Sequence, residues 1–253
     1  MNRIGFIGTG HIAAPMVRFL ATRGHDVTIS KRNARAAEDL RASHGIRVAD
    51  NQDVLEASDI VFLCLRPAVA EAVVAPLRFR ADQKIVSVMA GISLARLGEW
   101  CAPSSDITLT IPLGFLEQGG CPLAACPSDE VLAPLFAPDN PVMPVPNEAA
   151  FNQHFAVCAM VPGLLDLMVT ASDWLSRQTG DPDGAAIYTR QLVAGFLASL
   201  PQGGAEMLPA ERDALATDGT ISLMMTTRLH DGGAHAALCT ALDAIGDRLG
   251  GRK

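Results

Sequence analysis

The sequence is short of aromatic residues, of lysine and of positive charge. It contains two tryptophans, one tyrosine and three lysines among 253 residues, and its formal net charge is −7. Because it offers no basic stripe, nucleic acid is not expected as a partner. No uninterrupted run reaches the roughly 18 apolar residues of a membrane span, and the chain opens on a strand pattern rather than a signal peptide. We therefore expect no membrane partner.

Cysteine is present but shows no regular spacing. Its six positions include no C-x-x-C pair, which argues against a zinc site and against a disulfide framework. Cys64 and Cys158 lie in apolar runs and are expected to be buried thiols. We therefore expect a cytoplasmic protein without a bound metal.

The start of the chain has the pattern of a strand, a tight glycine turn and a helix. An apolar run ends at Ile7, Gly8 and Gly10 follow with Ala13 three residues later, and a helical pattern continues to Arg23. Gly8 permits the sharp turn, Gly10 lets a phosphate approach the backbone, and Ala13 allows the helix to pack closely on the strand. This G-x-G-x-x-A pattern predicts a dinucleotide site at the helix N-terminus. The alternative is a glycine turn that binds no ligand.

Short apolar runs alternate with helical patterns through the first 147 residues, which is typical of βαβ units and a mainly parallel sheet. The predicted fold class is α/β, with an N-terminal Rossmann-type dinucleotide-binding domain. The expected strands are 3–7, 26–30, 47–48, 60–65, 84–89, 107–111, 123–126 and 142–145. The expected helices between them are 14–23, 34–43, 51–57, 68–78, 93–101 and 129–137.

A group of four prolines between residues 138 and 146 marks a domain boundary near residue 147. Beyond it the pattern is entirely helical, so we expect a dinucleotide-binding domain over 1–147 and an all-helical substrate and dimerisation domain over 148–253. Such an apolar helical set commonly pairs with a second copy of itself, and a homodimer or higher homo-oligomer is expected. The expected helices are 147–178, 183–200, 209–217, 220–230 and 234–249.

The end of the second strand indicates which nicotinamide cofactor the domain prefers. No acidic residue follows Ile29 to bind the ribose diol of NAD; the chain instead continues with Ser30, Lys31 and Arg32. A hydroxyl and cations could hold the 2′-phosphate of NADPH, which a carboxylate would repel. We therefore expect NADPH as cofactor, and expect Ser30→Asp with Arg32→Ala to shift preference toward NADH. The alternative is that these cations are solvated surface charge.

Several segments resemble the pyrroline-5-carboxylate reductase family. Residues 48–51 (Val-Ala-Asp-Asn) and the run from Ala57 to Pro67 are similar to the family's Asn and its strand followed by Lys-Pro. Residues 87–94 resemble its Ala-Gly-Val-Ser turn, and 191–195 and 229–233 resemble two segments of its helical half. The resemblance is strong over the first hundred residues and faint afterwards.

This resemblance implies a Rossmann domain, a helical dimerisation domain, NAD(P)H, and an active site between the domains and across a dimer. It assigns Asn51 to the adenosine end of the cofactor, and places Ala90 and Gly91 beside the nicotinamide. His11 is expected to contact the diphosphate. The full expected cofactor-binding set is Gly8, Thr9, Gly10, His11, Ile12, Ser30, Lys31, Arg32, Asn51, Leu65, Arg66, Pro67, Ala90 and Gly91.

Three substrate segments depart from the family pattern. Where the family has Met-Pro-Asn-Thr-Pro, this chain has Ile-Pro-Leu-Gly-Phe at 111–115, so leucine replaces the asparagine that would face the substrate. Its Ser-Gly-Ser-Gly-Pro is here Cys-Ala-Met-Val-Pro at 158–162, and its carboxylate-binding Ser-Pro-Gly-Gly-Thr-Thr is here Thr-Asp-Gly-Thr-Ile-Ser at 217–222. These changes suggest a retained hydride donor with a more apolar substrate pocket. The expected substrate-binding residues are Pro112, Leu113, Gly219, Thr220 and Ser222.

The residues available for proton transfer favour reduction of C=N over reduction of C=O. Hydride transfer to a ketone needs an acid, and related hydroxyacid dehydrogenases use a lysine on the long helix, where this chain has none. An iminium arrives already protonated, so no acid need act in the same step. Asp166 and Thr170 share one helix face and could steady a cationic imine, although both could instead face water or a partner helix. We expect Asp166, Thr170 and Ser222 as the catalytic residues.

The sequence thus predicts an NADPH-dependent oxidoreductase that reduces a cyclic imine to a secondary amine such as proline. Proline biosynthesis is the corresponding role. Two alternatives stay open, namely a broader-specificity imine reductase and a regulator that senses NADPH without catalysis.

Overall fold

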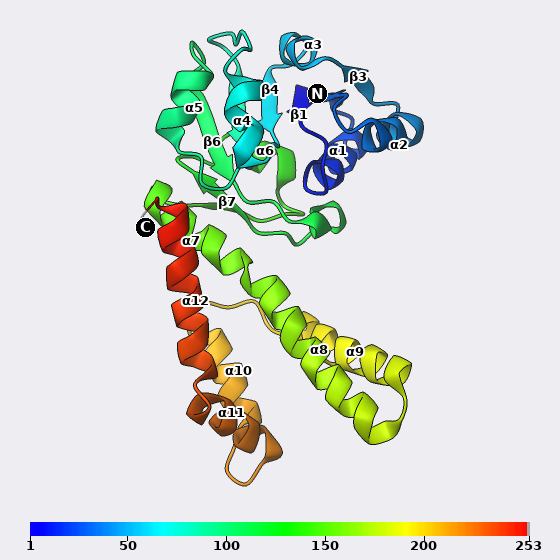
Figure 1. Cartoon of the computed structure of the whole chain (residues 1–253), viewed down its shortest axis with the longest axis vertical. Helices are drawn as coiled ribbons and strands as arrows, with labels where there is room; N and C mark the ends of the chain where they lie inside the picture. The colour runs from blue at the N-terminus through cyan, green and yellow to red at the C-terminus, as the bar shows by residue number, and fades with distance from the viewer. Residues whose placement is uncertain (252–253) are drawn as a thin grey trace. The chain divides into compact units, whose positions relative to one another are not determined.

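The computed structural model describes residues 1–251 and divides them into two compact units. The first unit comprises Met1–Phe155 together with the residues from Gly246 onward, and the second comprises Ala156–Ile245. Figure 1 shows the strands gathered in the first unit and long helices in the second. One of the three lysines, Lys253, lies outside the described residues.

The first unit is built on an eight-stranded sheet in the order β3-β2-β1-β4-β5-β6-β7-β8. The first six strands are parallel, which is the doubly wound arrangement predicted from the alternating pattern. β7 runs antiparallel to β6, since the twelve-residue connection contains only the short helix η1 (Gly114–Gln118) rather than a crossover helix. The strands are β1 (Arg3–Ile7), β2 (Asp26–Ser30), β3 (Arg47–Ala49), β4 (Ile60–Leu63), β5 (Lys84–Ser87), β6 (Asp106–Thr110), β7 (Leu123–Cys126) and β8 (Val142–Pro144).

Some helices of this unit begin or end at residues that suit a helix terminus. The Asn33 side chain caps α2, a left-handed Gly45 ends it, Pro67 opens α4, and the Ser93 side chain caps α5. The helices are α1 (Ala13–Thr22), α2 (Ala34–His44), α3 (Asn51–Glu56), α4 (Pro67–Val74), α5 (Leu94–Trp100), α6 (Ala133–Phe136) and α7 (Glu148–Cys158), the last of which ends in the second unit.

The core lies between the sheet and the helices that cover it. Phe6 of β1 and Phe62 of β4 are fully buried and stack at 4.7 Å, and Phe136 meets Phe62 edge-on. Aromatic pairs of this kind add stabilisation beyond the area they bury. The two central strands are thereby fixed side by side, and the loops at their carboxyl ends start from a rigid base.

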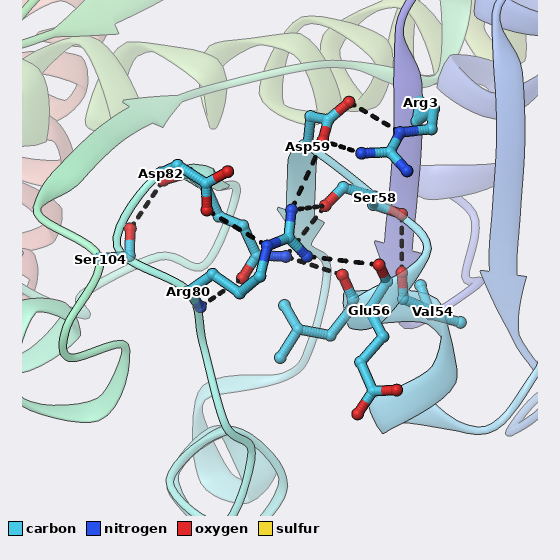
Figure 2. A network of polar contacts seen from close by, with 10 residues as sticks. Arg3, Val54, Glu56, Ser58, Asp59, Arg80, Asp82 and Ser104 are labelled. Carbon is cyan, nitrogen blue, oxygen red and sulfur yellow. Dashed lines mark hydrogen bonds and ion pairs between the residues drawn. The ribbon is translucent and has the colours of Figure 1, made fainter.

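A polar network closes the opposite, amino-terminal edge of the sheet (Figure 2). Arg80 donates to the Ser58 carbonyl at 3.2 Å and pairs with Asp59, whose carboxylate also accepts from Arg3 at the start of β1. The hydrogen bond from Arg3 lowers the pKa of Asp59 below its ordinary value. The ionised Asp59 carboxylate therefore stabilises the folded protein at pH values above the ordinary pKa of an aspartate. This stabilisation is lost as the pH falls through the lowered pKa of the folded state. The network thus ties together the segments that lead into β1, β4 and β5.

The second unit is entirely helical among the residues described. A break at Ala159 separates α8 from α7, where the sequence predicts one continuous helix. α8 and α9 lie side by side, as Figure 1 shows. Gly180 and Asp181 connect them. The helices are α8 (Met160–Thr179), α9 (Pro182–Ser199), α10 (Met207–Leu215), α11 (Ile221–Asp231) and α12 (Ala234–Leu249), the last of which ends in the first unit.

The second unit buries very little of its apolar surface within one chain. Leu165 and Leu167 of α8 are 54% and 64% exposed, and Leu192 of α9 is 57% exposed. The stretch Glu148–Thr179 is long and apolar enough to cross a membrane, but one such stretch is weak evidence, because a helix buried in a soluble assembly passes the same test.

Candidate functional site

The glycine turn after β1 has the geometry that a bound phosphate requires. Gly8 has φ +99°, and a Cβ at this position would lie 2.3 Å from the Cys64 carbonyl oxygen, so only glycine fits. A Cβ on Gly10 would meet nothing within 4 Å, because this residue faces open space beyond the turn. Helix α1 begins at the buried Ala13. A phosphate can therefore approach the backbone of Gly10 at the helix N-terminus.

A cavity of about 630 Å³ opens beside this turn. Its walls come from the loops that follow β1, β2 and β4, together with Val88 after β5. β1 and β4 flank the point at which the strand order reverses, which is where doubly wound sheets bind their ligands. The lining residues are Thr9, Gly10, His11, Ile12, Ala13, Arg32, Asn33, Ala34, Cys64, Leu65, Arg66, Val69 and Val88.

The charge of this cavity fits a phosphorylated nucleotide. Arg32 and Arg66 line it and both are exposed, and His11 of the glycine turn lines it as well. No carboxylate occurs among the described residues that form its walls. An open glycine backbone, a helix N-terminus and two guanidinium groups together satisfy the needs of a diphosphate and a 2′-phosphate.

Ser30 has a different role from the predicted one. It is 1% exposed, its hydroxyl accepts a hydrogen bond from the Gly8 N–H at 2.8 Å, and its carbonyl accepts from the Thr9 hydroxyl. A side chain held inside the turn cannot reach a phosphate in the cavity without moving. Ser30 thus supports the glycine turn, and a Ser30→Asp change would disturb the turn itself as well as cofactor preference.

Lys31 and Arg32 are both exposed, but only one of them lines the cavity. The Lys31 ammonium pairs with Asp50 at 2.6 Å, and Lys31 is not among the lining residues, whereas Arg32 is. Arg32 is therefore the better candidate for a 2′-phosphate contact. Asn51, the first residue of α3, follows Asp50 directly and is half-buried.

The remaining predicted cofactor residues follow β4 and β5. Leu65 and Arg66 line the cavity and Pro67 opens α4 beside them. Ala90 is half-buried and Gly91 is exposed with φ +71°, in the turn between β5 and α5. This turn lies outside the cavity walls. The carboxylate of Glu148 accepts a hydrogen bond from the Leu94 N–H at 3.0 Å and so fixes the end of this turn where α5 begins.

The predicted substrate residues lie in two places. In the first unit Pro112 is buried, and Leu113 packs against the core cluster, so its side chain is committed to structure at least in part. In the second unit Gly219 has φ +79° and precedes α11, which Thr220 caps by accepting from the Leu223 N–H.

The predicted catalytic residues all lie on helices of the second unit. Asp166 and Thr170 are exposed, and the Thr170 hydroxyl donates to the Asp166 carbonyl one turn earlier on α8. Ser222 is half-buried in the first turn of α11. Their catalytic roles, like those of the substrate residues, stay predictions.

Sequence reasoning did not assign several residues that the cavity brings together. Cys64 and Val88 follow buried strands but are themselves half-buried, and Cys158 is half-buried as well, so the prediction of buried thiols at 64 and 158 is wrong. Desolvation raises the pKa of the Cys64 thiol. The sequence shows that an amide side chain follows Arg32 at position 33, but it does not show which groups Asn33 bonds, because these depend on how the chain folds. The fold and the cavity together define a dinucleotide-binding domain of the Rossmann class.

Comparisons with known proteins agree with this class. Residues 3–91 match the family described as NADP oxidoreductase, coenzyme F420-dependent. A pyrroline-5-carboxylate reductase of Mycobacterium tuberculosis is 27% identical over 98% of this chain and 92% of its own length. Another, from Corynebacterium melassecola, is 26% identical over 44% of this chain and 45% of its own length. The predicted resemblance to the pyrroline-5-carboxylate reductase family is confirmed.

Solved structures show the same fold at low identity. The pyrroline carboxylate reductase of Plasmodium falciparum, solved with NADP bound, has a TM-score of 0.82 at 12% identity and covers 98% of this chain and 97% of its own. An imine reductase from Pseudomonas sp. has a TM-score of 0.61 at 15% identity, with 95% of this chain and 90% of that chain covered. The Rossmann domain followed by a helical region is thus confirmed as the fold class.

Proposed function

We propose that this protein is an NADPH-dependent reductase of a cyclic imine, of the pyrroline-5-carboxylate reductase type. The observation that carries the proposal is the cavity beside Gly8 and Gly10, with Arg32 and Arg66 in its walls and no carboxylate among its described lining residues. The near full-length relatives of that name support the choice of C=N as the reacting bond.

When bound, NADPH supplies a hydride to the carbon of the imine. The glycine turn and α1 bind the diphosphate, Arg32 binds the 2′-phosphate, and the turn at Ala90 and Gly91 lies at the carboxyl edge of the sheet expected to face the nicotinamide. The protein needs to orient the imine and exclude water, and a protonated imine needs no acid in the hydride step. We assign Asp166 to steadying the positive charge of such an imine.

The contribution of Arg32 can be measured by its removal. Arg32→Ala is expected to raise the Kd for NADPH roughly 10- to 100-fold, because a charge-assisted hydrogen bond contributes about 1.5–3 kcal/mol. The Kd for NADH is expected to stay the same, since that cofactor has no 2′-phosphate. Lys31→Ala is the matched control, because Lys31 is already paired with Asp50. Equal losses for both cofactors would contradict the assignment.

Turnover separates the proposal from its two rivals. Substrate-dependent oxidation of NADPH with pyrroline-5-carboxylate is expected. Oxidation with simple cyclic imines but not with pyrroline-5-carboxylate would instead favour the broader imine reductase. Leu113 in place of the family's asparagine, and Asp218 in the segment that matches its carboxylate-binding loop, support this alternative. NADPH binding without oxidation of NADPH by either substrate class would leave only the regulator.

We further propose that the protein acts as a cytoplasmic homodimer or higher homo-oligomer through its helical unit. The exposed leucines of α8 and α9 support self-association, because large apolar side chains gathered on two neighbouring helices are typical of a surface that a partner covers. Association of the helical units would bury the stretch Glu148–Thr179, and would account for its membrane-like composition without a membrane.

A further inference from the structure

Hydrogen bonds within the protein join the glycine turn to the end of β2 and the loop that follows it. Asn33 donates from its Nδ2 to the Thr9 carbonyl at 2.9 Å, across 24 residues of sequence. Its Oδ1 accepts from the Ala36 N–H at 3.3 Å and caps α2. One amide side chain therefore serves both a helix cap and a link between loops.

Two further hydrogen bonds complete the link from the other side. The Ser30 hydroxyl accepts from the Gly8 N–H, and the Thr9 hydroxyl donates to the Ser30 carbonyl at 3.0 Å. Both Ser30 and Thr9 are at least 97% buried, so water does not compete for these bonds. Asn33 itself is exposed and lines the cavity beside Arg32.

We propose that Asn33 is a positioning residue that holds the 2′-phosphate loop and the diphosphate turn at a fixed separation. The inference rests on the proposed function, since both loops are assigned to NADPH. Arg32 directly precedes Asn33. The bond from Asn33 to Thr9 therefore holds the Arg32 guanidinium close to where the 2′-phosphate of the cofactor will bind, before binding occurs. Preorganisation of this kind raises affinity by lowering the ordering cost of binding. The link also supports the turn that receives the diphosphate, so it acts on NADPH and NADH alike.

The variant Asn33→Ser separates the link from the helix cap. Serine retains the cap, as Ser93 does for α5, but its short side chain cannot reach the Thr9 carbonyl. We expect Asn33→Ser to raise the Kd of both NADPH and NADH about tenfold, because binding must then order the two loops at a cost of about one net hydrogen bond. The melting temperature is expected to fall by no more than about 4 °C, since only one hydrogen bond is lost. Asn147→Ser is the matched control, because the Asn147 side chain caps α7 in the same way through the Ala150 N–H.

Hydrogen–deuterium exchange provides the second readout. Amides of residues 8–13 are expected to exchange faster in Asn33→Ser than in the unmodified protein, whereas those of α2 are expected to be unaffected. A Kd for NADH that does not change would overturn the proposal, since it would place Asn33 on the 2′-phosphate directly. An effect no larger than that of Asn147→Ser would overturn it as well. Absence of NADPH binding by the unmodified protein would overturn the proposed function itself, and is distinguishable from both results.

Discussion

Replacing Gly8 with alanine is expected to destabilise the protein severely and to abolish cofactor binding. The new Cβ would lie 2.3 Å from the Cys64 carbonyl oxygen, and the backbone at φ +99° is strained for any residue with a side chain. Backbone strain costs about 1–3 kcal/mol and overpacking costs about as much again. We therefore expect the melting temperature of the first unit to fall by roughly 10 °C.

Gly10→Ala is the matched partner of this substitution and should have the opposite profile. A Cβ at Gly10 meets nothing within 4 Å, so stability is expected to stay unchanged. The methyl group would occupy the space where a phosphate approaches the backbone, and the Kd for NADPH is expected to rise at least about tenfold. Thermal melting and calorimetric titration of the two variants measure both quantities. Normal binding of NADPH by Gly10→Ala would contradict the prediction that a cofactor phosphate lies at this turn.

Placing a charge on the apolar face of the helical unit is expected to separate the proposed dimer. Leu192 of α9 is 57% exposed within one chain, and burial of a leucine contributes about 1.5–3 kcal/mol. Because a symmetric interface contains each residue twice, Leu192→Glu is expected to cost about 3–6 kcal/mol per dimer. This corresponds to a dissociation constant for the dimer at least 100-fold higher.

Analytical ultracentrifugation tests this second prediction. The unmodified protein is expected to sediment as a dimer or larger species, and Leu192→Glu as a monomer at micromolar concentration. Gln191→Glu is the control, since it adds the same charge to the neighbouring exposed position without removing apolar surface. A monomeric unmodified protein, or equal behaviour of the two variants, would contradict self-association through α9.

Much of the first unit could be predicted from the sequence, because local pattern and tertiary structure agree there. All eight predicted strands occur within two residues of their expected bounds, since buried parallel strands are short apolar runs between helical segments. The antiparallel direction of β7 could not be predicted, because direction depends on the connection between strands and not on the composition of β7. The break between α7 and α8 has a signal in the sequence, because Pro162 has no N–H to donate to the Cys158 carbonyl and its ring crowds that carbonyl.

Residues of the candidate site could be predicted from the sequence where the residue type itself indicates the role, as glycine does in a tight turn. Gly8 and Gly10 follow from the needs of a tight turn, and both lie in the predicted turn. Ser30 could not be assigned correctly, because its place on β2 turns its hydroxyl toward Gly8 rather than toward the cavity. Asn33 caps α2 through a local hydrogen bond that the sequence can suggest, but its bond to the Thr9 carbonyl spans 24 residues and depends on the folded structure.

The most direct test of the whole account is calorimetric titration of the purified protein with NADPH and with NADH under the same conditions. Saturable binding of NADPH, at least tenfold tighter than that of NADH, is predicted from the cationic cavity beside the glycine turn. Heat from neither nucleotide would contradict a dinucleotide site altogether, and tighter binding of NADH would contradict the role given to Arg32.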